Sequence, residues 1–300
     1  MNKSFTLIEI LVVIVVIGVL SAFILVGMSS ITSSASIARG QAFVNSLDNS
    51  LLLARVSQWK LDEGTGASVN DSWGTNTGAF GSSPANPAWV NSGCVSNKCL
   101  SFDGGDYVNV GDPASGSLDF GTGNFTISAW IKLNSLSGSG YAIVSKQDSA
   151  WTDAAGWTFS VNGDDIIFYR YDGAGPSRLQ RKNDIFTQAG VWYHVMAVCN
   201  YNSSIDLYIN AIEPSTYNNT YTAWSTLSNA QNFQIGAQAN IQMLFNGSID
   251  DVRIYNQAIS TSQIQQNYYV GINKLFRNNG IVIKEYNQRL SELRESLSNK

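Results

Sequence analysis

The segment FTISAWIKL, residues 125–133, alternates between two sets of side chains along its whole length. One set is apolar throughout and consists of Phe125, Ile127, Ala129, Ile131 and Leu133. Successive side chains of a β-strand point to opposite faces, so this period of two predicts a strand with one buried face. The same period recurs further along, where Ile205, Leu207 and Ile209 alternate with Asp206 and Tyr208.

Outward from this segment, similar short strands are predicted on both sides, separated by the Gly, Asn, Asp and Ser residues that turns favour. They cover residues 99–103, 106–110, 141–146, 157–162, 165–170, 191–199, 232–236 and 249–255. The chain holds 26 glycines, 5 prolines and 11% aromatic residues, which suits a turn-rich β protein. About ten strands in one body predict a mainly β fold, an antiparallel two-sheet jelly-roll sandwich.

Composition excludes several classes of protein. Hydrophobic residues make up 44% and charged residues 13% of the 300 residues, so most of the chain is not disordered. A net charge of −4 argues against binding to nucleic acid, which needs many basic side chains. One histidine and three cysteines are too few for most zinc sites, which draw three or four ligands from these types.

The amino-terminal region has a different character. From Phe5 to Met28 the only charged side chain is Glu9, and a helix here would reach roughly 36 Å, enough to cross a hydrocarbon core of ~30 Å. Lys3 precedes this stretch, so the amino end is predicted to stay cytoplasmic while the body lies outside the membrane. The alternative is a cleaved secretory signal, whose apolar region normally covers only about 7–15 residues.

An apolar stripe at spacings of mainly three and four continues beyond the membrane segment 5–28 and predicts one long helix over residues 5–56. The stripe consists of Ile31, Ala35, Ala38, Ala42, Leu47, Leu51 and Ala54. It would pack either on the chain's own globular domain or along the core of a filament.

The run KSFTLIE, residues 3–9, closely resembles the amino-terminal signature of type IV pilins and pseudopilins. The resemblance implies that residues 1–4 are a leader, that a prepilin peptidase cuts between Ser4 and Phe5, and that Phe5 is then N-methylated. It also implies that Glu9 faces the new amino group of a neighbouring subunit, where the two opposite charges satisfy each other. Ser4 stands where the family usually has Gly.

Five runs in the body together resemble the laminin-G-like, concanavalin A-like jelly-roll domain that is common on bacterial surfaces. They are WKLDEGTG at 59–66, LSFDG at 100–104, FTISAWI at 125–131, WYHV at 192–195 and GSIDDVRIYN at 247–256. The resemblance covers residues 57–270 and implies a two-sheet sandwich. Some members of this family bind calcium through aspartates.

Catalysis is not expected. Glycoside hydrolases with related sandwiches need two carboxylates flanking the scissile bond, commonly in a Glu-x-Asp-x-x-Glu run, and the sequence contains no such run. Asp164-Asp165 and Asp250-Asp251 are adjacent pairs, and a strand would point the members of each pair to opposite faces. The single histidine, His194, lies in a predicted strand and is expected to be structural.

Asp250 is the main candidate for a calcium ligand. Alternation in the last predicted strand places it on the inward face with Val252 and Ile254, where a carboxylate needs a partner or a metal. With Glu63 or Asp71 it would form a calcium site. The alternative is that Asp250 accepts hydrogen bonds from the backbone or from an arginine.

Aromatic side chains in predicted loops are candidates for stacking on a carbohydrate ligand. They are Trp151, Tyr171, Tyr217, Tyr221 and Trp224. The alternative is that they cover the ends of the sandwich.

Cys94 and Cys99 bracket the loop Val-Ser-Asn-Lys, and outside the membrane a disulfide across this loop is expected. Cys199 is left over in a predicted strand and is expected to be a buried free thiol.

The end of the chain is predicted to be helical. Ser260 and Gln263 form a capping box that opens a short helix through Tyr269. In the tail, 271–300, a turn at 278–280 precedes an amphipathic helix. Its apolar stripe consists of Tyr286, Leu290, Leu293 and Leu297. The tail is predicted to dock on its own sandwich, with a partner subunit as the alternative.

These expectations combine into a pilin-like or pseudopilin-like surface subunit without enzymatic activity. Its partners would be the prepilin peptidase, other pilin-like subunits, the membrane and an extracellular glycan or protein ligand, with no nucleic acid. A minor subunit of a type IV pilus or of a type II secretion-type filament fits a large displayed domain. The alternatives are an uncleaved, single-pass membrane-anchored surface protein that binds glycans or proteins, and, less favoured, a glycoside hydrolase.

Overall fold

The computed structural model describes residues 51, 53–81, 86–138, 140–147, 155–171, 178–201, 203–214, 218–219, 224–238 and 243–298. The chain divides into two compact units, Met1–Leu52 and Leu53–Lys300. The fold described below is that of the second unit. The predicted leader, the membrane segment 5–28 and the residues Ser4, Phe5 and Glu9 lie outside the described residues.

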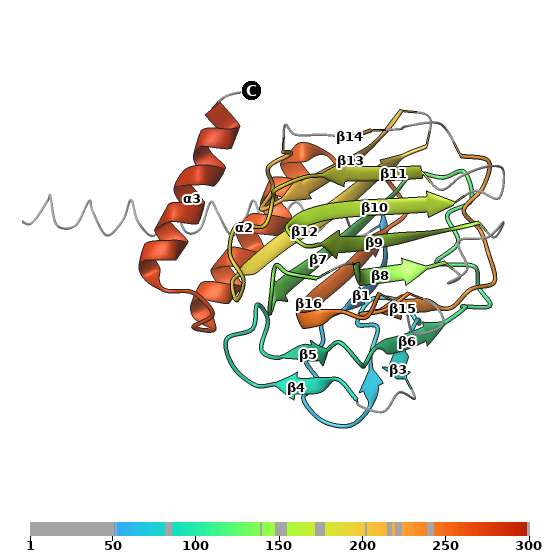
Figure 1. The fold of residues 1–300 in the computed structure, drawn as a ribbon, viewed down its shortest axis with the longest axis horizontal. Coiled ribbons are helices and arrows are strands. Elements are labelled where there is room, and N and C mark those ends of the chain that lie inside the picture. Colours follow the sequence, from blue (N-terminus) through green and yellow to red (C-terminus); the bar gives the residue numbers. More distant parts are fainter. Residues whose placement is uncertain are drawn as a thin grey trace, which may run out of the picture. The chain divides into compact units, whose positions relative to one another are not determined.

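Two antiparallel sheets form the body, which confirms the predicted sandwich (Figure 1). The seven-stranded sheet runs in the order β13-β12-β7-β16-β5-β4, with β1 paired to β16. Its strands are β1 (Arg55–Trp59), β4 (Ala88–Val90), β5 (Cys99–Asp103), β7 (Phe125–Leu133), β12 (Trp192–Asn200), β13 (Ser204–Ile209) and β16 (Asn246–Tyr255).

The nine-stranded sheet runs in the order β14-β11-β10-β9-β8-β15-β6-β3-β2. Its strands are β2 (Ser68–Val69), β3 (Gly78–Phe80), β6 (Val108–Gly111), β8 (Tyr141–Lys146), β9 (Gly156–Asn162), β10 (Asp165–Tyr171), β11 (Arg178–Lys182), β14 (Asn218–Asn219) and β15 (Phe233–Ile235). The sequence did not predict the five-residue strands β1 and β11, nor β2, β3, β4 and β14, which are too short to show a period of two.

The apolar core lies between the sheets. All five apolar residues of the 125–133 alternation belong to it, so the predicted buried face of β7 is confirmed. Aromatic rings fill much of the layer: Phe120 stacks on Phe125 at 4.3 Å between ring centroids, and Trp59 stacks on Phe233 at 5.0 Å. Each fully buried ring of this kind contributes roughly 1.5–3 kcal/mol through the hydrophobic effect, which holds the sheets face to face.

One lysine is buried at the rim of this core. Lys146, the last residue of β8, has no exposed surface. Its Nζ donates to Asp112 Oδ1 at 2.9 Å, to Asp119 Oδ1 at 3.0 Å and to the backbone oxygen of Asn229 at 2.7 Å. The ammonium therefore joins two loops at one end of the sandwich: the β6–β7 loop, which carries both aspartates, and the segment before β15.

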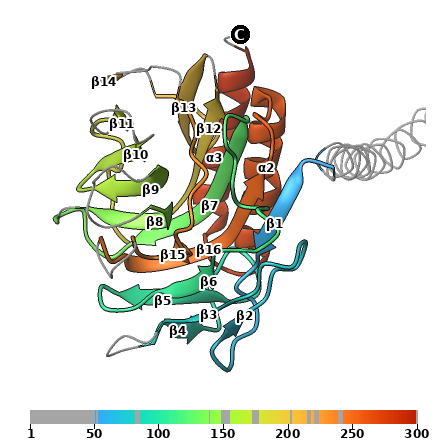
Figure 2. The same ribbon diagram turned by 90° about the vertical axis from the view of Figure 1, so that its right-hand side faces the viewer.

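Two helices, α2 (Thr261–Arg277) and α3 (Ile283–Ser298), lie on the side of the seven-stranded sheet that faces away from the nine-stranded one (Figure 2). The predicted capping box is present, because Ser260 Oγ accepts from Gln263 N and the Gln263 side chain accepts from Ser260 N. Helix α2 packs closely through Gly271, where a Cβ would lie 2.3 Å from Cζ2 of Trp130. Among the described residues, no helix is both long and apolar enough to span a membrane.

Two helix boundaries differ from the sequence prediction. The chain is already a strand at Arg55, so the predicted helix does not extend to Val56; Ser57 pairs with Ile254 of β16 instead. At the other end, α2 runs past Tyr269 to Arg277, because the turn at 278–280 is the first feature that stops it.

Candidate functional site

A β-bulge in β16 reorients the two adjacent aspartates. The pairing with β7 shifts between Asp250 and Arg253, and Asp251 adopts a positive φ of 46°. Ile249, Val252 and Ile254 all lie in the core, whereas Asp250 does not. The predicted inward alternation of Asp250 with Val252 and Ile254 is therefore wrong, because the bulge inserts one residue into the pattern.

Asp250 instead accepts hydrogen bonds from the backbone, as the alternative interpretation stated. Its Oδ2 accepts from the N–H groups of Val95 at 2.8 Å and Ser96 at 2.9 Å, and the residue has no exposed surface. Burial, followed by the nearby charge of Asp251, holds the pKa of the Asp250 carboxyl well above its usual range. Oδ1 has no hydrogen-bond partner among the described residues.

The structure does not bring the proposed calcium ligands together. Asp71 Oδ1 accepts from the N–H groups of Gln58 and Gly74 at 2.9 Å, and Glu63 Oε1 accepts from Asn70 N at 2.8 Å. In the described part of the chain, two groups of three potential ligand side chains have their ligand atoms within 4.8 Å of one another. They are Cys94, Cys99 and Asp250, and Asp164, Asp165 and Asp184. The trio Glu63, Asp71 and Asp250 is neither of these groups, so calcium binding stays a prediction.

The cysteines behave as predicted. Cys94 and Cys99 form a disulfide, and Cys199 is free and buried. In the group Cys94, Cys99 and Asp250, the two sulfurs are therefore bonded to each other and are not available as metal ligands.

His194 lies in a packed polar layer between the seven-stranded sheet and α2. Its Nε2 is 2.9 Å from Ser128 Oγ, and its ring stacks on Tyr268 of α2 at 6.0 Å between ring centroids. Burial, followed by the charge of Arg253, lowers the pKa of His194 to about 3. A neutral histidine and a serine, both nearly without exposed surface, cannot meet a substrate, so this pair supports the fold.

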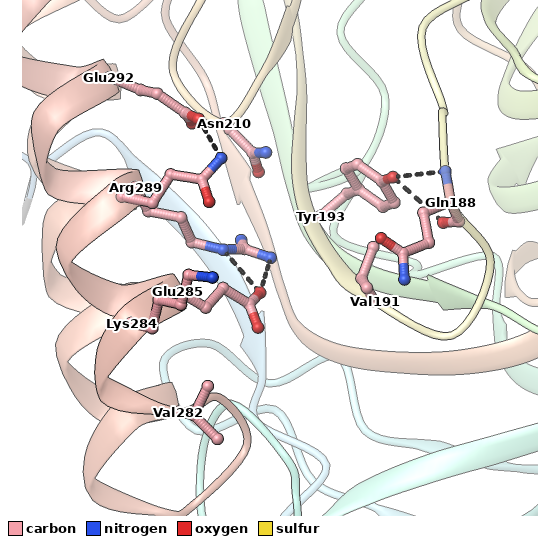
Figure 3. Close-up of a pocket in the computed structure, with 10 residues that line it drawn as sticks. Gln188, Val191, Tyr193, Asn210, Val282, Lys284, Glu285, Arg289 and Glu292 are labelled. Atoms are coloured by element: carbon pink, nitrogen blue, oxygen red, sulfur yellow. Dashed lines mark hydrogen bonds and ion pairs between the residues drawn. The ribbon is translucent and has the colours of Figure 1, made fainter.

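A pocket of about 360 Å³ lies between α3 and the neighbouring ends of β12 and β13 (Figure 3). One wall is α3, which contributes Lys284, Glu285, Gln288, Arg289 and Glu292. The facing wall comes from the sandwich and contributes Gln188, Val191, Tyr193 and Asn210. The pocket thus exists only because the helical tail docks on its own domain, as the sequence predicted.

Arg289 connects the two walls. It is only 7% exposed, and its Nε and Nη2 donate to Glu285 Oε1 at 3.0 and 2.7 Å. Nη2 also donates to the backbone oxygen of Trp192 at 2.8 Å, which holds α3 against the first residue of β12. Figure 3 shows Arg289 and Glu285 reaching from α3 toward the loop that carries Gln188. Nη1 finds no hydrogen-bond acceptor among the described residues.

The remaining polar groups are held in place by short-range hydrogen bonds. Tyr193 Oη donates to the backbone oxygen of Gln188 and accepts from its N–H, both at 3.1 Å. Asn210 Oδ1 accepts from His194 N at 3.0 Å, and Gln288 Nε2 donates to Glu292 Oε1 at 3.0 Å. These bonds hold the polar groups of the lining in fixed positions.

The lining mixes hydrogen-bond donors and acceptors and balances charge. Lys284 and Arg289 are cations, Glu285 and Glu292 are anions, and carboxamides, an aromatic ring and two valines complete the walls. A hydroxyl group can donate and accept at the same time, so a ligand with several hydroxyls matches such a lining. No sequence motif marked these residues; the only available signal was the amphipathic tail, which predicted docking but not its position.

The aromatic candidates lie elsewhere. Trp224 is 1% exposed and belongs to the core, where its Nε1 donates to the backbone oxygen of Gly121 at 3.0 Å. Tyr171, the last residue of β10, is also buried, at 8% exposed. The prediction that these two rings present free faces to a ligand is therefore wrong. Trp151, Tyr217 and Tyr221 lie outside the described residues.

Residues 102–265, more than half of the chain, match the family model described as the concanavalin A-like lectin/glucanases superfamily, and the chain belongs to this superfamily. Residues 1–25 match the prokaryotic N-terminal methylation motif. Both resemblances found in the sequence are thus confirmed. A search of curated proteins finds no match.

Solved structures share the sandwich fold. The binding domain of Paraclostridial Mosquitocidal Protein 1 is 17% identical with a TM-score of 0.59, covering 74% of this chain and 53% of that chain. The Botulinum neurotoxin serotype G binding domain is 14% identical with a TM-score of 0.56, covering 73% and 51%. The chain thus spans about half the length of these toxin domains.

A third structure is Domain 4 of AbnA, a GH43 extracellular arabinanase from Geobacillus stearothermophilus, in complex with arabinotriose. It is 15% identical with a TM-score of 0.53, covering 72% of this chain and 98% of that chain. At these identities the likeness shows the fold alone.

Proposed function

We propose that this protein is a pilin-like surface subunit that displays a glycan-binding, non-enzymatic lectin-like domain outside the membrane. The observation that carries the proposal is the combination, in one chain, of an N-terminal methylation motif and a concanavalin A-like sandwich. A prepilin peptidase cuts after Ser4, Phe5 is methylated, and the helix that follows anchors the subunit and packs with other pilin-like subunits.

The ligand is a saccharide bound in the pocket beneath α3. Two features support this choice: the lining combines donors with acceptors, and opposite charges balance within it, so a neutral molecule rich in hydroxyls is matched better than an ion. The arabinanase domain of the same fold is seen with arabinotriose, which makes a sugar ligand reasonable for this architecture. A protein ligand, by analogy with toxin binding domains, is the second candidate.

A saccharide array tests the proposal. The fragment 53–300, which is one compact unit, is expected to bind a defined set of saccharides. Lys284→Ala and Glu292→Ala each remove one side chain of the pocket and are expected to weaken binding about tenfold, the usual effect of losing a charge-assisted hydrogen bond. Lys60→Ala, an exposed lysine outside the pocket lining, is the matched control.

Two results would contradict the proposal. Binding that is unaffected by both pocket variants would place the ligand elsewhere on the domain. No binding across neutral and acidic saccharides, together with capture of a defined surface protein, would favour the protein ligand.

A further inference from the structure

The loop closed by the Cys94–Cys99 bond, called here the disulfide loop, is held by two carboxylates. Asp250 Oδ2 accepts from the N–H groups of Val95 and Ser96, and Asp62 Oδ1 accepts from those of Asn97 and Lys98, both at 2.9 Å. All four backbone N–H groups between the two cysteines are therefore bound to side chains of the sandwich. This requires the loop to keep one compact conformation.

The carbonyl groups of the disulfide loop hold the end of α2. Asn278 Nδ2 donates to the backbone oxygen of Val95 at 3.0 Å and to that of Ser96. Asn278 is also the C-cap of α2, where its own N–H donates to Lys274 O. The disulfide loop thus fixes the point from which the chain turns into α3.

A second connection runs from the base of the disulfide loop to the pocket. Trp192 Nε1 donates to the backbone oxygen of Gly93 at 2.8 Å, and the backbone oxygen of Trp192 accepts from Arg289 Nη2 at 2.8 Å. Arg289 is the α3 residue that joins the two walls of the pocket. The disulfide loop is therefore connected to α3 by two indirect routes. One runs through Asn278, in the turn before α3, and the other runs through Trp192 of β12.

We propose that formation of the Cys94–Cys99 bond controls docking of α3, and therefore assembly of the pocket. The bond forms when the two thiols give up two protons and two electrons to the disulfide of an exported thiol–disulfide oxidant, which is reduced to two thiols. Without the bond, the disulfide loop loses its compact form and releases Asn278 and Gly93. That the assembled pocket binds a ligand rests on the function proposed above.

The cellular compartment determines whether Cys94 and Cys99 are present as two thiols or as a disulfide. The cytoplasm keeps thiols reduced, whereas disulfides form and persist outside the membrane. Cys94, Val95 and Cys99 are fully buried but lie outside the apolar cluster between the sheets, so the sandwich is expected to fold in either state, while the pocket becomes complete only after export. A subunit that has not crossed the membrane therefore does not bind its ligand.

Hydrogen exchange of the full-length protein tests the inference without any ligand. The double variant Cys94→Ser/Cys99→Ser is expected to exchange at least tenfold faster in α3 and in the last turn of α2, while β7 and β12 stay as protected as in wild type. Cys199→Ala, which removes the free cysteine, is the control and is expected to match wild type. Unchanged protection of α3 in the double variant overturns the inference.

A second variant decides the case in which the double variant fails to fold. Asn278→Ala keeps the disulfide but removes both hydrogen bonds to the disulfide loop, and it is expected to speed exchange in α3 at least tenfold. Wild-type exchange in α3 of this variant overturns the inference. The two proposals can fail separately. If α3 exchanges faster in the variants but the wild type binds no saccharide, the control of α3 docking by the disulfide is upheld and only the glycan-binding function is rejected.

Discussion

At the scale of single residues, the most consequential side chains are ionisable groups buried between the seven-stranded sheet and the elements packed on it. His194 has 2% exposed surface and stays neutral because burial and Arg253 oppose its charge. Asp251 is also buried, but it pairs with the Arg253 guanidinium and accepts from Gln58 Nε2 at 2.7 Å. Arg253 in turn donates to Asn267 of α2 at 2.7 Å, so paired charges connect sheet and helix while the histidine fills space as a neutral ring.

Because of His194, the domain should lose stability in mild acid. Its pKa is about 3 in the folded protein and about 6.5 in the unfolded chain, so the unfolded chain takes up the proton first. The stabilisation is fully present above about pH 6.5 and is lost as pH falls toward 3. Between pH 7 and pH 5 the wild-type free energy of unfolding is expected to fall about 2 kcal/mol more than that of His194→Gln, measured by urea denaturation. Equal pH dependence in the two proteins would contradict this.

At the scale of elements, the packing of α2 on the seven-stranded sheet depends on Gly271, which has no side chain. Gly271 allows the backbone of α2 to pack directly against the ring of Trp130. The same ring stacks on Tyr268 at 5.8 Å between ring centroids. The pocket and the disulfide loop both require α2 to sit at this depth, because Asn278 at its end contacts the loop.

A larger residue at position 271 should push α2 off the sheet. Gly271→Val is expected to lower the free energy of unfolding by about 1–3 kcal/mol, the usual cost of overpacking, and to speed hydrogen exchange in α3. Ser262→Val places the same side chain at an exposed position of α2, and its free energy of unfolding is expected to stay near that of the wild type. Equal stability of the two variants would show that the helix can shift without loss.

Much of this architecture could be predicted from the sequence, and the exceptions have physical causes. The strands β7 and β13 follow from a period of two because alternate apolar residues of each enter the core between the sheets. In β16 the same rule failed at Asp250, since a bulge at a positive φ leaves no trace in the pattern of apolar residues. The pocket could not be predicted, because Arg289 and Gln188 are distant in sequence and meet only through the docking of α3.

At the scale of the whole molecule, the protein joins an N-terminal methylation motif to a concanavalin A-like sandwich. The methylation motif occupies residues 1–25, and the superfamily match begins only at residue 102. Under the proposed function each part has its own chemistry: Glu9 would lie in an apolar medium, where an opposite charge is its natural partner, whereas the sandwich would lie in water.

Filament assembly should therefore depend on Glu9 and not on the pocket. Glu9→Ala is expected to insert into the membrane and to be processed to a mature chain starting at N-methylated Phe5, as mass spectrometry of the terminus would show. It is nevertheless expected to be absent from sheared filaments, because the pairing with a neighbouring amino group is lost. Lys284→Ala, altered only in the pocket, is expected to enter filaments normally. Unchanged filament content of Glu9→Ala would contradict the proposed role of Glu9 in assembly.

The buried ammonium of Lys146 has one more consequence for a domain exposed to changing surroundings. It occupies the space between Asp112 and Asp119, where two carboxylates and a carbonyl oxygen would otherwise attract a dissolved cation. A covalently attached charge cannot be diluted, chelated or exchanged. This end of the sandwich therefore needs no dissolved cation to hold Asp112, Asp119 and the Asn229 carbonyl together.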